Sequence, residues 1–178
     1  MTPDERADAV RPRLSAQDAP TERVSTYVRR MQHGLLAAWP EEVLTQWLHR
    51  HGNQVEDWSF LPYERFRFEI ETWAVENLPG REAFSDPAFF DAFSRDLDYR
   101  AESNRHDWLA HYMLREGTWN TPPIVLEHLE AEYRDTGGRF LGTPYQLLEG
   151  HRRLSFAHFL KNSGRARPQH TVWVARIM

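Results

Sequence analysis

The residues with the clearest chemical potential lie in one run of five, Glu149-Gly150-His151-Arg152-Arg153. A glycine permits a sharp turn or a close approach of the backbone to a ligand. Two adjacent arginines can donate charge-assisted hydrogen bonds to an anion such as phosphate. A histidine can donate to phosphate or exchange protons near neutral pH, and a carboxylate can act as a general base or bind Mg²⁺. The predicted ligand-binding residues are therefore Gly150, His151, Arg152 and Arg153, and the predicted catalytic residues are Glu149 and His151.

The segments on either side of this run predict that it lies between a strand and a helix. Residues 145–148 are apolar and short enough to form a buried strand. Apolar residues at helical spacing then predict a helix over residues 153–161, which ends near Asn162 and Gly164. The first turn of a helix has unpaired N–H groups and a partial positive charge. Arginines are unfavourable there unless an anion binds beside them, so the position favours an anion site.

A purely structural explanation of the same run is equally compatible with the sequence. The two arginines can be solvated, or they can pair with some of the 26 acidic residues of the chain. Glu149 can form a salt bridge with either arginine, and His151 can cap the helix. Both explanations stay open at the level of sequence. Weaker candidates for the same cleft are Glu127, His128, Gln169 and His170.

The composition predicts a folded protein without thiol chemistry. Hydrophobic residues make up 40 % of the 178 residues and include seven tryptophans, which is enough for a sizeable core. The absence of cysteine excludes disulfides, thiolate metal sites and catalysis by a thiol. No apolar run of membrane length and no signal-peptide pattern occur, so we expect a cytoplasmic location and no membrane partner.

The charge is distributed unevenly along the chain. The last 40 residues contain seven basic residues and one acidic residue, a net charge of +6, whereas the preceding 138 residues carry −10. A basic tail behind an acidic front predicts either an anionic ligand at the tail or docking of one part on the other. The overall charge of −4 and the pI of about 6.1 make nucleic acid an unlikely partner.

The first 104 residues predict mainly helical structure. The polar residues 1–20 contain three prolines and little periodicity, so they predict a mobile tail. Apolar stripes and capping residues predict helices over residues 21–38, 40–51 and 86–97. Alternation of phenylalanine and charged residues predicts a short strand over residues 66–70, followed by a helical turn near Trp73.

Residues 105–178 predict a small mixed α/β region. A helix over residues 105–116 has Asn104 and Asp107 as candidate caps, presents Trp108 and Leu109 on its apolar face and ends at Gly117. Residues 124–126, 145–148 and 171–177 predict three strands of one sheet, and residues 129–144 predict an inserted loop. The predicted fold class is α+β, with a mainly helical part over residues 21–104 that packs on this sheet and is not a separate domain.

This order of elements resembles the ParB/sulfiredoxin-like nucleotide-binding domain. The family pattern is a helix, a glycine, a Pro-Ile-Val strand, a second strand that ends in an acidic-Gly-His-Arg-Arg turn, a helix and a further strand. The matching residues are Trp108 to Glu116, Gly117, Pro123-Ile124-Val125, Leu147 to Arg153, Leu154 to Lys161 and Thr171 to Ile177. The resemblance covers some 70 residues, and its most specific part is the Glu-Gly-His-Arg-Arg turn.

The resemblance implies that Gly150 and the three residues after it hold a nucleotide or another phosphate. It also implies a nucleoside triphosphate with Mg²⁺ as the cofactor, if there is one. Two departures from the family limit the activity: the chain has no room for the helix-turn-helix region of chromosome-partitioning proteins, and it has no cysteine for sulfiredoxin chemistry. The loop over residues 129–144 is also longer than usual.

Two classes of function follow from these patterns. The first is an enzyme, namely a nucleotide hydrolase, a phosphotransferase or a nuclease that acts at the Gly150 turn. The second is a non-catalytic regulatory or protein-interaction module, whose helical first half would bind a protein partner. Metal-dependent catalysis needs carboxylates, and the basic tail offers only Glu149, with Glu127, Glu130 and Glu132 upstream.

Overall fold

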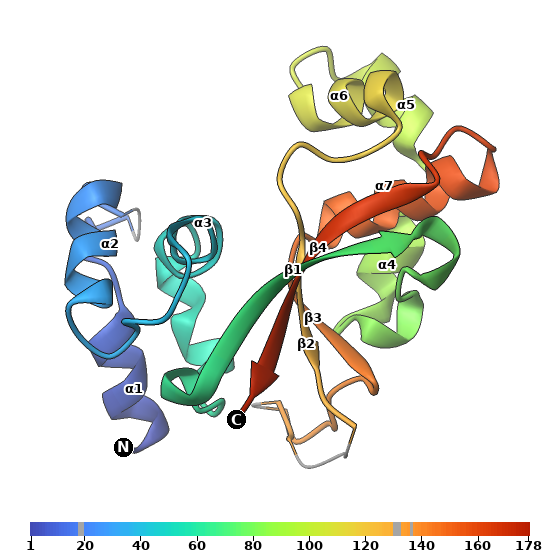
Figure 1. Cartoon of the computed structure of the whole chain (residues 1–178). Coiled ribbons are helices and arrows are strands. Elements are labelled where there is room, and N and C mark those ends of the chain that lie inside the picture. The colour runs from blue at the N-terminus through green and yellow to red at the C-terminus, as the bar shows by residue number, and fades with distance from the viewer. Residues whose placement is uncertain (18–19, 130–132, 136) are drawn as a thin grey trace. The chain divides into compact units, whose positions relative to one another are not determined.

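The computed structural model describes residues 1–17, 20–129, 133–135 and 137–178 (Figure 1). It is an α+β protein with one mixed sheet of four strands. The chain forms two compact units. The first consists of Met1–Phe68, Ala131–Leu141 and Ala175–Met178, and the second of Glu69–Glu130 and Gly142–Val174.

The sheet contains all the strands that the sequence predicts. Across the sheet the strands are β1 (Phe66–Ala74), β4 (Gln169–Ile177), β2 (Ile124–Glu127) and β3 (Tyr145–Glu149). β2 and β3 pair antiparallel, with Ile124 opposite Glu149 at one end and Glu127 opposite Tyr145 at the other. The prediction that residues 124–126, 145–148 and 171–177 share a sheet is therefore confirmed. The first strand is longer than predicted, because it continues through Trp73 to Ala74 before a helical turn.

The first unit consists mostly of short helical segments around a cluster of aromatic rings. These segments are α1 (Pro3–Val10), α2 (Val24–Gln32), α3 (Glu41–Val43), the π-helix η1 (Leu44–His49) that continues α3, and the 3₁₀ helices η2 (Gly52–Trp58) and η3 (Tyr63–Arg65). The buried ring of Trp39 stacks on Trp47 at 5.6 Å and on Phe66 at 5.8 Å between ring centres. Its Nε1–H donates to the carbonyl oxygen of Tyr63 at 3.1 Å, so the polar atom of this core residue is satisfied.

Helix α1 occupies the segment for which the sequence predicts a mobile tail. Thr2 and Glu5 form a reciprocal capping box at its start, and Ala7 and Val10 are buried. The hydroxyl of Tyr27 donates to the carbonyl oxygen of Val10 at 2.7 Å and ties the end of the helix to α2. The prediction overlooked the capping box, and the contacts that bury this short helix come from residues distant in the sequence.

The second unit contains most of the sheet and the 12-residue helix α7. Its helical segments are the 3₁₀ helices η4 (Val75–Asn77) and η5 (Arg81–Ala83), and the α-helices α4 (Pro87–Phe93), α5 (Leu97–Ser103), α6 (Trp108–Glu116) and α7 (His151–Asn162). Asp86 caps α4 and Asp107 caps α6, as the sequence predicts. The helix predicted over residues 86–97 is instead two, because α4 ends at Phe93 and a new helix begins at Leu97.

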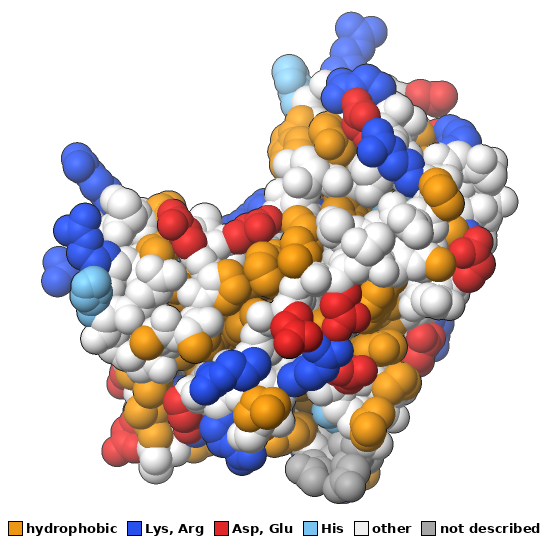
Figure 2. All heavy atoms as spheres, viewed as in Figure 1, with side chains coloured by type: hydrophobic (Ala, Val, Ile, Leu, Met, Phe, Trp, Pro, Cys, Tyr) orange, Lys and Arg blue, Asp and Glu red, His pale blue; other side chains and the backbone are white. Residues whose placement is uncertain are grey.

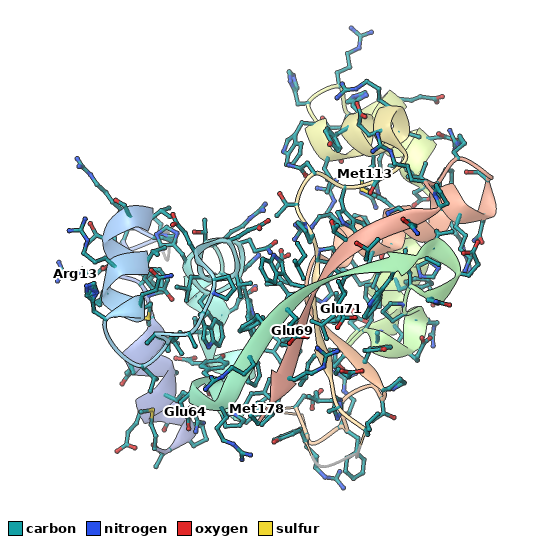
Figure 3. All side chains as sticks on the ribbon, in the orientation of Figure 1. Arg13, Glu64, Glu69, Glu71, Met113 and Met178 are labelled. Atoms are coloured by element: carbon teal, nitrogen blue, oxygen red, sulfur yellow. The ribbon has the colours of Figure 1, made fainter. Side chains whose placement is uncertain are left out.

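One hydrophobic core joins the helices of the second unit to its sheet. It contains Leu97 from α5, Met113 from α6, Phe156 from α7 and Val174 from β4; Met113 is labelled in Figure 3. Residues on both sides of position 105 share this core, and no boundary between the two compact units falls at position 105. Trp108, predicted on the apolar face of α6, has 58 % of its surface exposed, so that part of the prediction is wrong. In the part of the chain that the structure describes, no helix is long and apolar enough to cross a membrane.

Candidate functional site

The Gly150 turn lies between β3 and α7, as the sequence predicts. Gly150 has φ 98°, a left-handed conformation that side chains rarely adopt. A β-carbon at this position would lie 2.6 Å from the Cβ of Pro123. This contact follows from the register, because the adjacent residues Ile124 and Glu149 are partners in the β2–β3 pair. Packing against Pro123 therefore already requires glycine here, without reference to a ligand.

Glu149 and Arg153 form a buried ion pair on the inner side of the turn. Their side chains are only 11 % and 8 % exposed, and Arg153 Nη2 donates to Glu149 Oε2. Arg153 Nη1 also donates to the carbonyl oxygen of Thr121 at 2.8 Å. The pair thus links the end of β3, the first turn of α7 and the segment that enters β2. The alternative in which Glu149 pairs with an arginine is the one observed, and that arginine is Arg153.

Arg152 lies on the outer side of the same turn. Its side chain is 38 % exposed, and Nη2 donates to Oδ2 of Asp107. Oδ1 of Asp107 accepts the backbone N–H of Ala110 at 3.2 Å, so this carboxylate serves both Arg152 and the start of α6. Since a guanidinium carries five N–H donors, Arg152 retains donors for a further anion.

His151 is half-buried between two aromatic rings. The centre of its imidazole lies 5.5 Å from that of Phe84 and 5.6 Å from that of Phe89, and both contacts are edge-on. The N-cap residue of α7 is Gly150, which has no side chain that could cap the helix, and His151 is the first residue of the helix. Among the predicted ligand-binding residues, His151 and Arg152 are therefore the two with exposed surface, whereas Gly150 and Arg153 are buried.

The structure places a second arginine close to Arg152 that the sequence analysis did not identify. The Cζ of Arg100, on α5, lies 3.9 Å from the ring centre of Phe93, and the Cζ of Arg152 lies 5.7 Å from the same centre. The two guanidinium carbons are therefore within about 10 Å of each other. Phe93 stacks on Phe89 at 4.3 Å, so one face of its ring is covered by a neighbour. The only signal in the sequence was the repeat of aromatic residues on α4, which we assigned to the core.

Glu127 does not join the Gly150 turn. It lies opposite Tyr145, at the far end of the β2–β3 pair from Glu149. It is three residue steps along the strand from Ile124, a distance of about 10 Å. The backbone N–H of the next residue, His128, donates to the carbonyl oxygen of Pro144 at 2.9 Å, which keeps it beside the start of β3.

His170 has a separate environment at the start of β4. Its Nδ1 lies 2.9 Å from Oγ1 of Thr118, and its ring packs against Trp119 at 4.7 Å between ring centres. Burial lowers the pKa of the His170 imidazole below its usual value, because the charged form loses its hydration. Gln169, the neighbour on the strand, is exposed. The structure therefore places His170 beside Thr118 and Trp119 at the start of β4, whereas the Gly150 turn joins the end of β3 to α7.

The arrangement of donors suits an anion better than a metal ion. Glu149 is engaged by Arg153, and the described residues contain no group of three His, Asp or Glu side chains that could hold a metal. Glu130 and Glu132, the other carboxylates considered, lie outside the described residues. At the turn, Arg152, Arg100 and the first turn of α7 are all electropositive, so the described donors suit an anion.

Comparisons of the chain with protein-family models, curated proteins and solved structures found no match. The resemblance to the ParB/sulfiredoxin-like domain therefore depends on the order of elements and the Glu-Gly-His-Arg-Arg turn alone.

Proposed function

We propose that this chain is a binding module for a nucleotide or another phosphate-bearing ligand, held at the start of α7. The observation that carries the proposal is the exposed side of the Gly150 turn. There, the N-cap residue of α7 is Gly150, which has no side chain to cap the helix, and Arg152 is 38 % exposed on the first turn. Backbone N–H groups at a helix start and a nearby guanidinium are the donors that phosphate oxygens commonly accept from.

Binding without catalysis agrees best with the state of Glu149. A general base or a magnesium ligand needs an accessible carboxylate, whereas Glu149 is 11 % exposed and paired with Arg153. His151 contacts the rings of Phe84 and Phe89, edge-on in both cases. The proposal therefore assigns ligand binding to His151 and Arg152 and a scaffolding role to Gly150, Glu149 and Arg153.

The resemblance to the ParB/sulfiredoxin-like domain supports the same location. In that family the glycine turn and the residues after it hold phosphates, and here the turn follows a strand and opens a helix in the same order. We propose that the chain belongs to this superfamily. Nucleic acid is a less favourable ligand, because acidic and basic side chains are interspersed on the face shown in Figure 2.

Calorimetric titration of the full chain tests the proposal. The ligands are ATP, ADP and inorganic pyrophosphate, each with and without Mg²⁺, and the variant is Arg152→Ala. We expect wild-type binding without any need for Mg²⁺, and an affinity at least about 10-fold weaker for the variant, since a hydrogen bond to a charged group contributes about 1.5–3 kcal/mol.

Arg165→Ala is the matched control for this titration. Arg165 is also a half-exposed arginine with one carboxylate partner, Asp98, but it lies outside the turn. The control should bind as wild type does. Absence of binding to wild type, or equal losses in the two variants, would show that Arg152 is an ordinary surface charge.

A further inference from the structure

The guanidinium of Arg100 is unusual because its contacts within the described residues are with a ring and not with an acceptor. It lies over Phe93 at 3.9 Å, and it forms no hydrogen bond or ion pair with any described residue. Its Nε is buried and has no partner. A guanidinium that lies over an aromatic ring has its N–H donors in its own plane, where they do not bond to the ring. A buried donor without an acceptor lowers the stability of the fold.

The Nε of Arg152 is buried and unpartnered in the same way. Its guanidinium lies 5.3 Å from the ring centre of Phe156 and 5.7 Å from that of Phe93. The two guanidinium groups thus lie near one ring, and among the described residues only Nη2 of Arg152 has a hydrogen-bond acceptor.

The charge of this cluster is not balanced within the described residues. Among the residues that the structure describes, Asp107 is the single carboxylate that forms an ion pair with either arginine, and its partner is Arg152. Two cations with one anionic partner leave about one positive charge, to which the start of α7 adds about half a charge. The cluster is therefore suited to a ligand that carries more than one negative charge at one end.

We propose that Arg100 and Arg152 together bind the terminal phosphate of the ligand, which is a phosphomonoester or a diphosphate and not a phosphodiester. The inference rests on the function proposed above and adds a residue from α5, outside the segment that resembles a known family. The terminal phosphate has three acceptor oxygens and up to two charges, whereas a phosphodiester has two free oxygens and one charge. Asp107 competes with the ligand for Arg152, because a carboxylate and a phosphate accept from the same donors.

The test measures binding of inorganic pyrophosphate and ADP to the full chain by calorimetry. The main variant is Arg100→Met, which keeps a flexible apolar side chain over Phe93 and removes the donors. We expect its affinity to fall on the order of 10-fold or more. Arg95→Ala is the control, because Arg95 is an exposed arginine just before α5, so its removal changes the net charge equally.

A third variant, Asp107→Asn, tests the competition directly. Asparagine caps a helix as well as aspartate does, so the start of α6 is preserved while the competing charge is removed. We expect this variant to bind pyrophosphate several-fold more tightly than wild type does. We also expect a smaller difference in affinity between pyrophosphate and ADP. Adenosine, which has no phosphate, should not bind to any of these variants with measurable heat.

The outcomes separate this inference from the proposed function. One outcome is that Arg152→Ala weakens binding, whereas Arg100→Met and Arg95→Ala bind with the same affinity. That outcome would overturn the role of Arg100 and would still support a ligand site at the start of α7. No binding of any phosphate by wild type would overturn both. If Arg100→Met does not fold, Arg100→Lys provides the measurement, because lysine retains the charge and loses the fork of donors; wild-type affinity in that variant would also contradict the inference.

Discussion

Arg6 in the first unit and Arg100 in the second are two arginines held inside helical regions with very different surroundings. Arg6 is 7 % exposed, and its Nη1 donates to the carbonyl oxygen of Ser59 at 2.6 Å while its Nε donates to Glu64 at 3.2 Å. Glu64 is labelled in Figure 3. Arg100 has no such acceptor among the described residues and contacts a ring. Burial alone therefore does not indicate the role of an arginine. We infer its role from whether its N–H donors have hydrogen-bond acceptors within the protein.

The same criterion divides the two neighbouring arginines of the Gly150 turn. Arg153 resembles Arg6, because it has a carboxylate and a backbone carbonyl as acceptors. Arg152 resembles Arg100, because its Nε is buried without an acceptor and part of its surface is exposed. Adjacent residues of one type thus separate into scaffold and candidate ligand contact, since successive side chains of a helix point about 100° apart.

Arg153→Met should have the largest effect on stability. It leaves the carboxylate of Glu149 buried without its cationic partner, and removal of one partner of a buried pair costs about 3–5 kcal/mol. Urea unfolding of the full chain, followed by circular dichroism, measures this loss. Arg165→Met is the control, because its ion pair with Asp98 is half-exposed and worth at most about 1 kcal/mol. Equal midpoints for the two variants would mean that the Glu149–Arg153 pair does not hold the turn.

Arg6→Met should have an intermediate effect. It leaves the carbonyl oxygen of Ser59 without its donor, and a lost hydrogen bond from a charged group costs about 1.5–3 kcal/mol. Glu64 is 35 % exposed and can be solvated instead, so the loss is smaller than for Arg153. Limited proteolysis should cut α1 faster in this variant than in wild type. Arg11→Met is the control, because the ion pair of Arg11 with Glu56 is more exposed; equal rates of cleavage would contradict the role of Arg6.

The sequence predicted the elements whose signals are local. The strands β2, β3 and β4 were evident from short apolar runs, and α6 from its cap Asp107 and its terminal glycine. Helix α1 was missed because its length of eight residues gives little periodicity, and the contacts that bury it come from distant residues such as Tyr27. The break between α4 and α5 was missed because the apolar spacing continues across it to Leu97.

The candidate site was predictable as a location but not as a set of contacts. The Glu-Gly-His-Arg-Arg run placed the turn correctly between a strand and a helix. The sequence left open which arginine pairs with Glu149, because that depends on the orientation of the two side chains in the first turn of α7. Arg100 lies 52 positions from Arg152, and only the packing of α4 and α5 brings it to Phe93. Long-range packing of this kind has no signature in local residue patterns.

Arg100→Met should have the smallest effect on stability, which is the sharpest test of the comparison. The variant loses a cation–π contact worth about 0.5–1 kcal/mol at a partly exposed site. It also removes a buried donor that has no acceptor, which costs about 1–3 kcal/mol in the wild type. Methionine retains contact with Phe93, because its flexible thioether packs favourably against aromatic rings. The two changes oppose each other, so we expect the free energy of unfolding to change by less than about 1 kcal/mol in the same urea series. A loss as large as that of Arg6→Met would place Arg100 with the structural arginines. Unchanged stability together with weaker binding of pyrophosphate is the combination that a scaffold residue cannot produce, since a scaffold residue acts on binding only through the fold.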